Sequence, residues 1–461
     1  MKKNEKIIYY YFLFLPIIDL FTSLIVNFSD IFVTPGMIIK GVTLLCCIVY
    51  IFFFSKSRYK KYSIIYLCLL SIFGITYIFL KNYNLSFSTI AYEGKFAFKY
   101  FYFPITLLGM LNIFNDFKIS KKLIIKILIS NAVIYTILMI IPYVTSTGLN
   151  SYGDYIIYEG KKGWFYAANE VGAILTLLLI SIYYILNYRK KIYIILILPL
   201  MISIAIIGTK VSFLGLIIMT ILCLVATLIN KKRQAIIPCL IVSLFFIVSL
   251  FFSPTFTNFT NLKNNFGNNT SKVETPEKSN DVKENDSSES NINKGDIITD
   301  KIIYKINKLE DIIPIHFVTQ SLRIILSGRD KFLIDNLNIY LTSNIEDKLF
   351  GLGWKDREEI NYTLSEKLIE IDVADIFIHY GLIGFIIYFL PLLYCIILGI
   401  KNIKYFTNET WLSFLTFMTG IGISLFAGHI LSAPTVSIYL VLLLGLTMIT
   451  ICEKKEIKWK I

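Results

Sequence analysis

The chain has 461 residues, of which 56% are hydrophobic and 15% aromatic, and its mean hydropathy is +0.66. This composition excludes an ordinary soluble domain and predicts a protein with many membrane-spanning helices. The formal net charge of +13 requires no nucleic-acid partner, because many basic residues lie in short loops between apolar segments, where they fix the topology.

Apolar runs long enough to cross the hydrocarbon layer as helices recur along the chain. We expect about twelve spans, near residues 7–27, 37–54, 62–80, 100–115, 121–143, 165–187, 191–208, 211–229, 235–253, 373–398, 411–428 and 431–451. The predicted fold is an all-α polytopic membrane protein. Residues 1–253 hold the first nine spans, and residues 372–461 hold the last three. The first span follows a basic start but has no small-residue cleavage site, so we expect a retained anchor.

Lysine and arginine fall in every second loop, beginning with the N-terminal segment. Under the positive-inside rule these loops and both termini are cytoplasmic. The long segment 254–371, between the ninth and tenth predicted spans, is then extracellular. None of the seven cysteines lies in this loop, so the sequence predicts no disulfide framework.

The predicted extracellular loop has two parts. Residues 263–295 are rich in Asn, Ser, Lys and Glu and cannot bury a core, so we predict a disordered insert that acts as a spacer. From Asp296 onward apolar residues recur at helical spacing. We therefore expect residues 296–371 to be helical and to form the functional half of the loop.

Ionisable residues in or beside the predicted spans gather at their extracellular ends. They are Asp19, Lys40, Lys95, Lys99, Glu170, Lys210, Asp372, Asp375, His379 and His429. A charge in hydrocarbon is costly, so such residues usually face the bundle interior or a wet cavity and mark a functional site. The clustering favours a site that opens on the outer face, because a transporter more often keeps its charges near the midplane.

Two basic motifs predict phosphate binding on this face. Arg329 lies in Gly328-Arg329-Asp330, where a glycine turn presents the planar guanidinium that suits phosphate oxygens. Lys210 follows Gly208-Thr209 at the start of a predicted helix, an arrangement typical of anion sites. We predict that Lys210, Arg329, Lys95 and Lys99 bind a substrate diphosphate. The alternatives are a solvated loop arginine and a lysine that snorkels to the interface.

Carboxylates near the start of the tenth predicted span are candidate bases. Asp372, Asp375 and His379 occupy helical positions i, i+3 and i+7, so they share a face. Glu370, Asp372 and Asp375 are the predicted catalytic residues, able to activate a sugar hydroxyl, with His379 in support. The alternative is a metal site, but no further His or Cys completes one, so we predict neither metal nor cofactor.

Three more polar residues are assigned supporting roles. Asn169 and Glu170 enter an apolar helix directly after an aromatic segment, and His429 lies between the eleventh and twelfth predicted spans. The structural alternative for Glu170 is an interhelical pair with Lys40 or Lys95. For His429 it is a hydrogen-bonded residue at the membrane edge.

In their order along the chain, these motifs resemble the O-antigen ligase/polymerase family of bacterial membrane glycosyltransferases. The matching segments are Pro16–Asp19, Gly163–Gly172, Gly208–Lys210, Ser327–Arg329, Gly351–Trp354, Asp372–Gly384 and Gly428-His429. The span count and the long external loop before the last three helices also match. The resemblance covers nearly the whole chain.

The resemblance implies a GT-C-like helical fold, a donor glycan on undecaprenyl diphosphate, and metal-independent transfer with inversion at the anomeric carbon. Lys210 and Arg329 match the family's two diphosphate-binding basic residues. Many members carry a His-Asn pair eleven residues before the glycine that matches Gly381, with the histidine proposed as base. This chain has Glu370-Ile371 there, and His379 is not at that position, so the base stays open among the three carboxylates.

The sequence therefore predicts a glycosyltransferase of the bacterial plasma membrane that polymerises or ligates undecaprenyl-diphosphate-linked repeat units. The product would be a capsular, cell-wall or O-antigen-type polysaccharide. Its expected partners are the lipid-linked donor, a glycan acceptor and membrane lipid, with a flippase and a chain-length regulator as further partners. The alternatives are a polysaccharide-lipid flippase or other transporter, and a non-catalytic membrane protein of envelope assembly.

Overall fold

The structure is a computed structural model. It describes residues 2–29, 34–81, 87–153, 158–188, 191–231, 236–258, 260–261, 326, 329–354 and 369–459. The predicted disordered insert, residues 263–295, lies outside the described residues, and so does much of the predicted helical half of the loop. The chain forms two compact units, one of Met1–Asn258 with Phe332–Ile461 and the other of Phe259–Lys331.

The described part of the chain is helical, and its only extended pairing is an isolated bridge between Asn150 and Lys161. The N-terminal helices are α1 (Lys3–Phe28), α2 (Pro35–Val49, continued by a π-helical turn, Tyr50–Phe54), α3 (Lys60–Lys81), α4 (Phe87–Asp116) and α5 (Lys121–Val144). The middle helices are α6 (Ala168–Leu178), α7 (Ser181–Tyr188), a 3-10 helix (Lys191–Leu196), α8 (Ile197–Ala205), α9 (Lys210–Lys231) and α10 (Ile236–Phe251). The remaining helices are α14 (Asp330–Thr342), α15 (Ile345–Phe350), α16 (Asp372–Lys401), a 3-10 turn (Ile403–Tyr405), α17 (Asn408–Ser424) and α18 (Pro434–Trp459).

The helical composition confirms the all-α class and a multi-pass membrane protein. Among the described residues, nine helices are long and apolar enough to cross a membrane. Nine of the twelve predicted spans coincide with them. The predicted spans 191–208, 235–253 and 411–428 coincide with shorter helices, α8 with the turn before it, α10 and α17. The count of twelve and the GT-C-like fold stay predictions.

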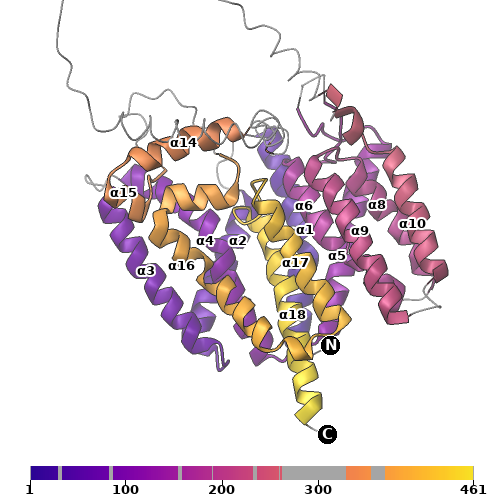
Figure 1. Cartoon of the computed structure of the whole chain (residues 1–461), viewed down its shortest axis with the longest axis horizontal. Coiled ribbons are helices and arrows are strands. Elements are labelled where there is room, and N and C mark those ends of the chain that lie inside the picture. The colour runs from indigo at the N-terminus through magenta and orange to yellow at the C-terminus, as the bar shows by residue number, and fades with distance from the viewer. Residues whose placement is uncertain are drawn as a thin grey trace, which may run out of the picture. The chain divides into compact units, whose positions relative to one another are not determined.

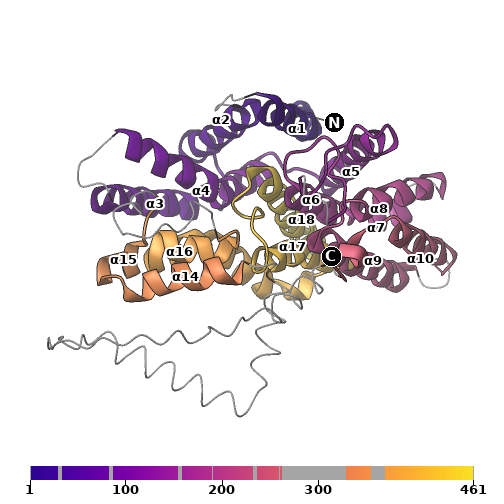
Figure 2. The same cartoon turned by 90° about the horizontal axis from the view of Figure 1, so that it is seen from above.

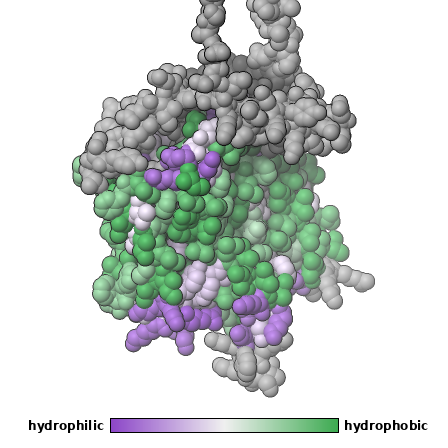
Figure 3. Space-filling view, turned by 60° about the vertical axis from the view of Figure 1, so that its left-hand side comes forward, coloured by the Kyte–Doolittle hydropathy of each residue, from purple (hydrophilic) through white to green (hydrophobic). Residues whose placement is uncertain are grey.

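Three helices form the centre of the large unit. The apolar stretches of α6 with α7, of α18 and of α4 are 89%, 83% and 72% buried, whereas those of α1, α2 and α3 are less than a third buried. Figures 1 and 2 show α17 and α18 between α3, α4 and α16 on one side and α5 and α8 to α10 on the other. On the face drawn in Figure 3, hydrophobic side chains form a broad band, and hydrophilic side chains gather below it. This surface suits a lipid environment.

Polar side-chain contacts join different helices and loops at each end of the unit. At the end that holds the predicted cytoplasmic loops, the contacts are Arg58 to Cys452 (2.7 Å), Lys121 to Glu409 (3.1 Å) and Ser120 to Glu5 (3.1 Å). At the other end they are Lys40 to Asp19 (2.9 Å) and Thr435 to Glu170 (2.8 Å). Three of the predicted site residues, Asp19, Lys40 and Glu170, therefore take part in contacts at this second end.

Helix α16 is broken at Gly381, where φ is +66°. The backbone of Gly351 lies directly against this break, and Leu352 and Gly353 donate their N–H groups to the carbonyls of Ile378 and His379 at 2.9 and 3.2 Å. A left-handed backbone favours glycine, and so does the close approach of two backbones. The break lets residues 351–354 dock on the first turns of α16.

We expect Gly381→Ala to destabilise the protein by about 1–3 kcal/mol, because alanine would adopt a strained φ. An added Cβ would also overlap the backbone of Gly351 and Leu349. The measurement is thermal unfolding in detergent micelles. Gly74→Ala in α3 is the control, because a Cβ there meets nothing within 4 Å. Equal stability of the two variants would contradict the assignment.

Candidate functional site

A cavity of about 300 Å³ lies at the end of the bundle where the predicted site residues gather. Its walls come from α1, α2, α4, α5, α6 and the start of α18, and five Asp, Glu or Lys residues line it. They are Asp19, Lys40, Lys95, Lys99 and Glu170. Aromatic and aliphatic side chains complete the walls, among them Phe98, Phe165 and Ile174. An apolar cavity with a small number of polar groups that point into it is typical of a ligand site.

Two of the charged residues in the cavity wall neutralise each other. Lys40 Nζ lies 2.9 Å from Asp19 Oδ1, with both side chains buried, and the Tyr135 hydroxyl donates to Asp19 Oδ2 at 3.0 Å. A buried charge is tolerated when it is paired and hydrogen-bonded in this way. Lys40 thus pairs with Asp19 rather than with Glu170, and its charge is compensated within the wall.

The other cations face the cavity without such compensation. Lys95 is exposed and Lys99 half-buried, and both lie on α4. Within the described part of the chain, neither lysine has a carboxylate at ion-pairing distance, although Lys99 is in Coulombic range of Asp375. Glu170, in the first turn of α6, accepts a hydrogen bond from the Thr435 hydroxyl instead. The cavity therefore has an excess of positive charge.

Lys210 is the first residue of α9, and α6 packs closely against this helix start. Thr209 caps the helix, its hydroxyl accepting the N–H of Ser212 at 3.3 Å. A Cβ added to Gly172 would lie 3.4 Å from both Thr209 Oγ1 and Ser212 Cβ. The turn before α9 is left-handed at Gly208 (φ +73°), whose carbonyl accepts from Asn258. Half-buried Lys210 is thus held beside the α6 turn that carries Glu170.

Asp372 joins α16 to the hairpin between α17 and α18. Its side chain is 1% exposed. Oδ1 accepts the N–H of His429 (3.0 Å) and the hydroxyl of Ser432 (2.6 Å), while Oδ2 accepts the N–H groups of Ile430 (2.8 Å) and Leu431 (2.7 Å). Two carboxylate oxygens provide about four acceptor sites, so these donors fill them all.

The same hairpin lies against Glu370. A Cβ added to Gly428 would lie 2.7 Å from the backbone carbon of Glu370, so only glycine fits there. Both Glu370 (φ +59°) and His429 (φ +67°) have left-handed backbones, which are unfavourable for residues other than glycine. Both side chains are half-buried, and His429 Nδ1 is buried with no hydrogen-bond partner among the described residues. Strained backbone residues of this kind cluster at functional sites.

Asp375 and His379 form a buried pair in the first two turns of α16. Asp375 is 1% exposed, and its Oδ1 lies 3.7 Å from His379 Nε2. His379 Nδ1 lies 2.8 Å from the Gly353 carbonyl, and its ring stacks on Trp354 with centroids 3.7 Å apart. A carbonyl can only accept a hydrogen bond, so Nδ1 carries a proton and donates to Gly353, and the other ring nitrogen, Nε2, faces Asp375.

The structure adds one residue that the sequence analysis missed. Glu93, on α4, is 6% exposed; it accepts the N–H of Trp354 at 2.7 Å and the hydroxyl of Tyr77 at 2.8 Å. The signal for it was present, because an acidic residue near a membrane-spanning stretch is a functional candidate by default. It was obscured by the two lysines that follow on the same helix.

The remaining predicted residues lie in different places. Asn169 is half-buried in the first turn of α6, next to Glu170. Arg329 belongs to the second unit, where it is half-buried and its N–H donates to the Leu326 carbonyl at 3.1 Å. The pairing of Arg329 with Lys210 stays a prediction. Within the described residues, no group of three or more His, Cys, Asp or Glu side chains has a metal-binding arrangement.

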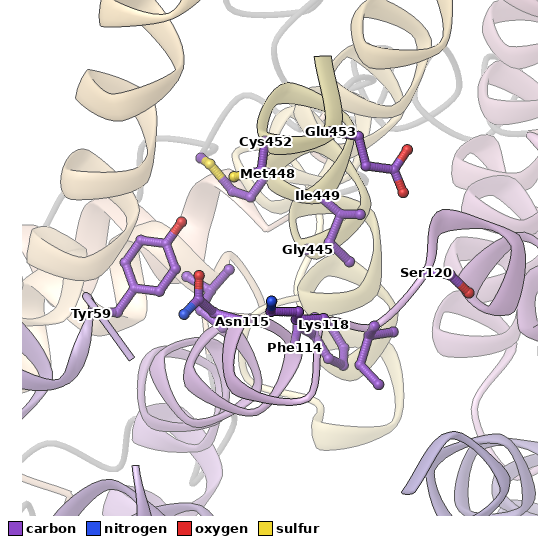
Figure 4. Close-up of a pocket in the computed structure, with 12 residues that line it drawn as sticks. Tyr59, Phe114, Asn115, Lys118, Ser120, Gly445, Met448, Ile449, Cys452 and Glu453 are labelled. Atoms are coloured by element: carbon purple, nitrogen blue, oxygen red, sulfur yellow. The ribbon is translucent and has the colours of Figure 1, made fainter. Parts of the chain in front are cut away.

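A second cavity, of about 220 Å³, lies at the other end of the bundle (Figure 4). Tyr59, Asn115, Lys118, Cys452 and Glu453 are among the residues that line it. None of the predicted site residues does so. The candidate site is therefore the cavity between α1, α2, α4 and α6, together with Glu370 and the hairpin residues Gly428 and His429 beside it. We call this second part, just before the start of α16, the acidic mouth.

Comparison with known proteins gives one match. The family model described as "O-antigen ligase like membrane protein" matches residues 1–454. No curated protein and no solved structure matches the chain significantly.

Asp372→Asn is expected to destabilise the protein. An amide has one acceptor oxygen, so its NH₂ group would face N–H donors of the hairpin and leave them unpaired, at about 1–3 kcal/mol for each buried donor. Asp375→Asn is the matched control, because Asp375 Oδ1 has no hydrogen-bond partner within the described structure. Thermal unfolding in detergent compares the two. An unchanged midpoint for Asp372→Asn would refute the anchoring role.

Proposed function

Because the chain belongs to the family of O-antigen ligase like membrane proteins, we propose that it transfers a glycan from an undecaprenyl-diphosphate donor to a glycan acceptor. A role in polysaccharide assembly follows from the family itself. The proposal places the reaction on the outer face of a bacterial plasma membrane, with polymerisation or ligation of repeat units as the outcome. The observation that carries it is a cation-lined cavity at the same end of the bundle as a strained acidic mouth.

The cavity suits the diphosphate of such a donor. Lys95 and Lys99 supply positive charge that no carboxylate in the wall neutralises directly. Lys210 is the first residue of α9, where the helix dipole also favours an anion. Arg329 completes the proposed set with a bidentate guanidinium. In this proposal the cations stabilise the charge that develops on the diphosphate as it leaves.

Among the three candidate carboxylates, the contacts favour Glu370 as the base. Both oxygens of Asp372 are occupied by hairpin donors, and Asp375 is buried beside His379. Glu370 is half-buried, at the strained position where the hairpin meets α16. We infer that Asp372 and Asp375 have structural roles and that Glu370 takes the proton of the acceptor hydroxyl.

The proposed step is a single displacement. The acceptor oxygen loses its proton to Glu370 and attacks the anomeric carbon from the side opposite the diphosphate. The new glycosidic bond forms as the bond from that carbon to the diphosphate oxygen breaks, so the configuration inverts. The bonding electrons leave with undecaprenyl diphosphate, and Glu370 later returns its proton to water.

Lys210→Ala and Arg329→Ala are each expected to reduce glycan elongation by at least about 10²-fold, since each removes a charge that stabilises the leaving group. The assay uses purified protein in liposomes with lipid-linked repeat units and follows glycan length on gels. Lys161→Ala is the control, because Lys161 Nζ bonds Asn150 away from the cavity. Translocation of the lipid without elongation would overturn the enzyme proposal, and loss of activity with EDTA would overturn its metal-free form.

Glu370→Gln is expected to lower kcat by about 10²–10⁴-fold, the usual contribution of a general base. The KM for the lipid-linked donor should change little, because the donor diphosphate is proposed to bind elsewhere. Asp375→Asn should retain more activity than Glu370→Gln. The reverse order would assign the base to Asp375.

A further inference from the structure

Glu93 is a buried carboxylate that the proposed reaction leaves without a role. Its two oxygens join three elements, because Oε2 accepts from Tyr77 on α3 and Oε1 accepts from the backbone of Trp354. Burying a carboxylate is unfavourable unless its oxygens are hydrogen-bonded. The side chain therefore fixes the 351–354 segment against α4.

The fixed segment in turn holds the first part of α16. The indole of Trp354 lies between Phe96 of α4, with ring centroids 4.2 Å apart, and His379 of α16, with centroids 3.7 Å apart. The Gly353 carbonyl lies 2.8 Å from His379 Nδ1. Glu93 thus acts, through Trp354, on the short segment of α16 that begins two residues after Glu370.

Helix α4 carries two sets of residues on different faces. Glu93, Phe96 and Tyr100, at i, i+3 and i+7, all contact Trp354, whereas Lys95, Phe98 and Lys99 line the cavity. One rigid helix therefore connects the cations of the cavity with the segment that positions the acidic mouth. The distance between these cations and the acidic mouth therefore depends on the contact between Glu93 and Trp354.

We propose that Glu93 is a positioning residue that sets the distance between the diphosphate-binding cations and the base at the start of α16. The inference rests on the proposed function, since it assigns these two groups to donor and acceptor. Glu93 contacts neither substrate. It acts through the length and direction of its side chain rather than through its charge.

Two substitutions separate geometry from charge. Glu93→Asp keeps the carboxylate but is one methylene shorter, so Trp354 must shift or lose its bond. A displacement of this kind lowers kcat by about 10²-fold, and the donor KM should not change. Glu93→Gln keeps the length, and its amide can still accept from Trp354 and donate to the Tyr77 oxygen. It should therefore retain activity within about fivefold of the wild type, the loss expected for one weakened hydrogen bond.

The matched pair on α3 is Tyr77→Phe and Tyr62→Phe. The Tyr77 hydroxyl donates to Glu93, whereas the Tyr62 hydroxyl donates to the Leu390 carbonyl of α16, after the break, at 2.9 Å. Both changes remove one hydroxyl from the same helix. Only Tyr77→Phe should lower kcat.

The fluorescence of Trp354 gives a second readout of its position. It is measured in protein whose other three tryptophans, Trp164, Trp411 and Trp459, are replaced by Phe. Because Trp354 is 7% exposed, its emission should shift to the red and become quenchable by acrylamide in Glu93→Asp but not in Tyr62→Phe. A wild-type protein that fails to elongate glycan would refute the proposed function. If the wild type is active, full kcat in Glu93→Asp, or a folded but inactive Glu93→Gln, would overturn the positioning role.

Discussion

The hydrogen bonds that Asp372 accepts are the constraint on which the end of the bundle with the candidate site depends. A carboxylate that is 1% exposed at the start of an apolar helix is destabilising unless donors compensate it, and the α17–α18 hairpin supplies four. Three are consecutive backbone N–H groups, so the hairpin must wrap around the carboxylate. The need to point these three N–H groups at Asp372 determines the backbone conformation of the hairpin, including the left-handed φ at His429.

The fixed hairpin organises both halves of the candidate site. Its Gly428 end lies on the backbone of Glu370, and its Thr435 end donates to Glu170 in the wall of the cavity. Ala433, Pro434 and Thr435 are themselves part of that wall. The acidic mouth and the cationic cavity therefore share one short segment of chain.

Hydropathy and spacing could predict the helices and the end of the bundle where charges meet, because both follow from the separation of apolar and polar residues along the chain. They could not predict the partners of each charge. Asp372 and its donors are 57 to 60 residues apart, and a pattern at positions i, i+3 and i+7 predicts a shared face but not what covers it. Asp372 and Asp375 look alike in sequence and differ only through these contacts. The break at Gly381 was equally hidden, since glycine is common in membrane helices.

Transfer between two bound substrates requires a fixed distance between the departing diphosphate and the attacking hydroxyl. Here the proposed cations lie on α4 and the proposed base lies two residues before α16, so that distance depends on how α4 meets the first turns of α16. Stacked rings at 4.2 and 3.7 Å on the two faces of one indole leave little room for sliding. Rotation of α4 would move Lys95 and Glu93 together, so neither set can adjust alone. A separation built in this way is set by packing within the membrane bundle, before either substrate binds.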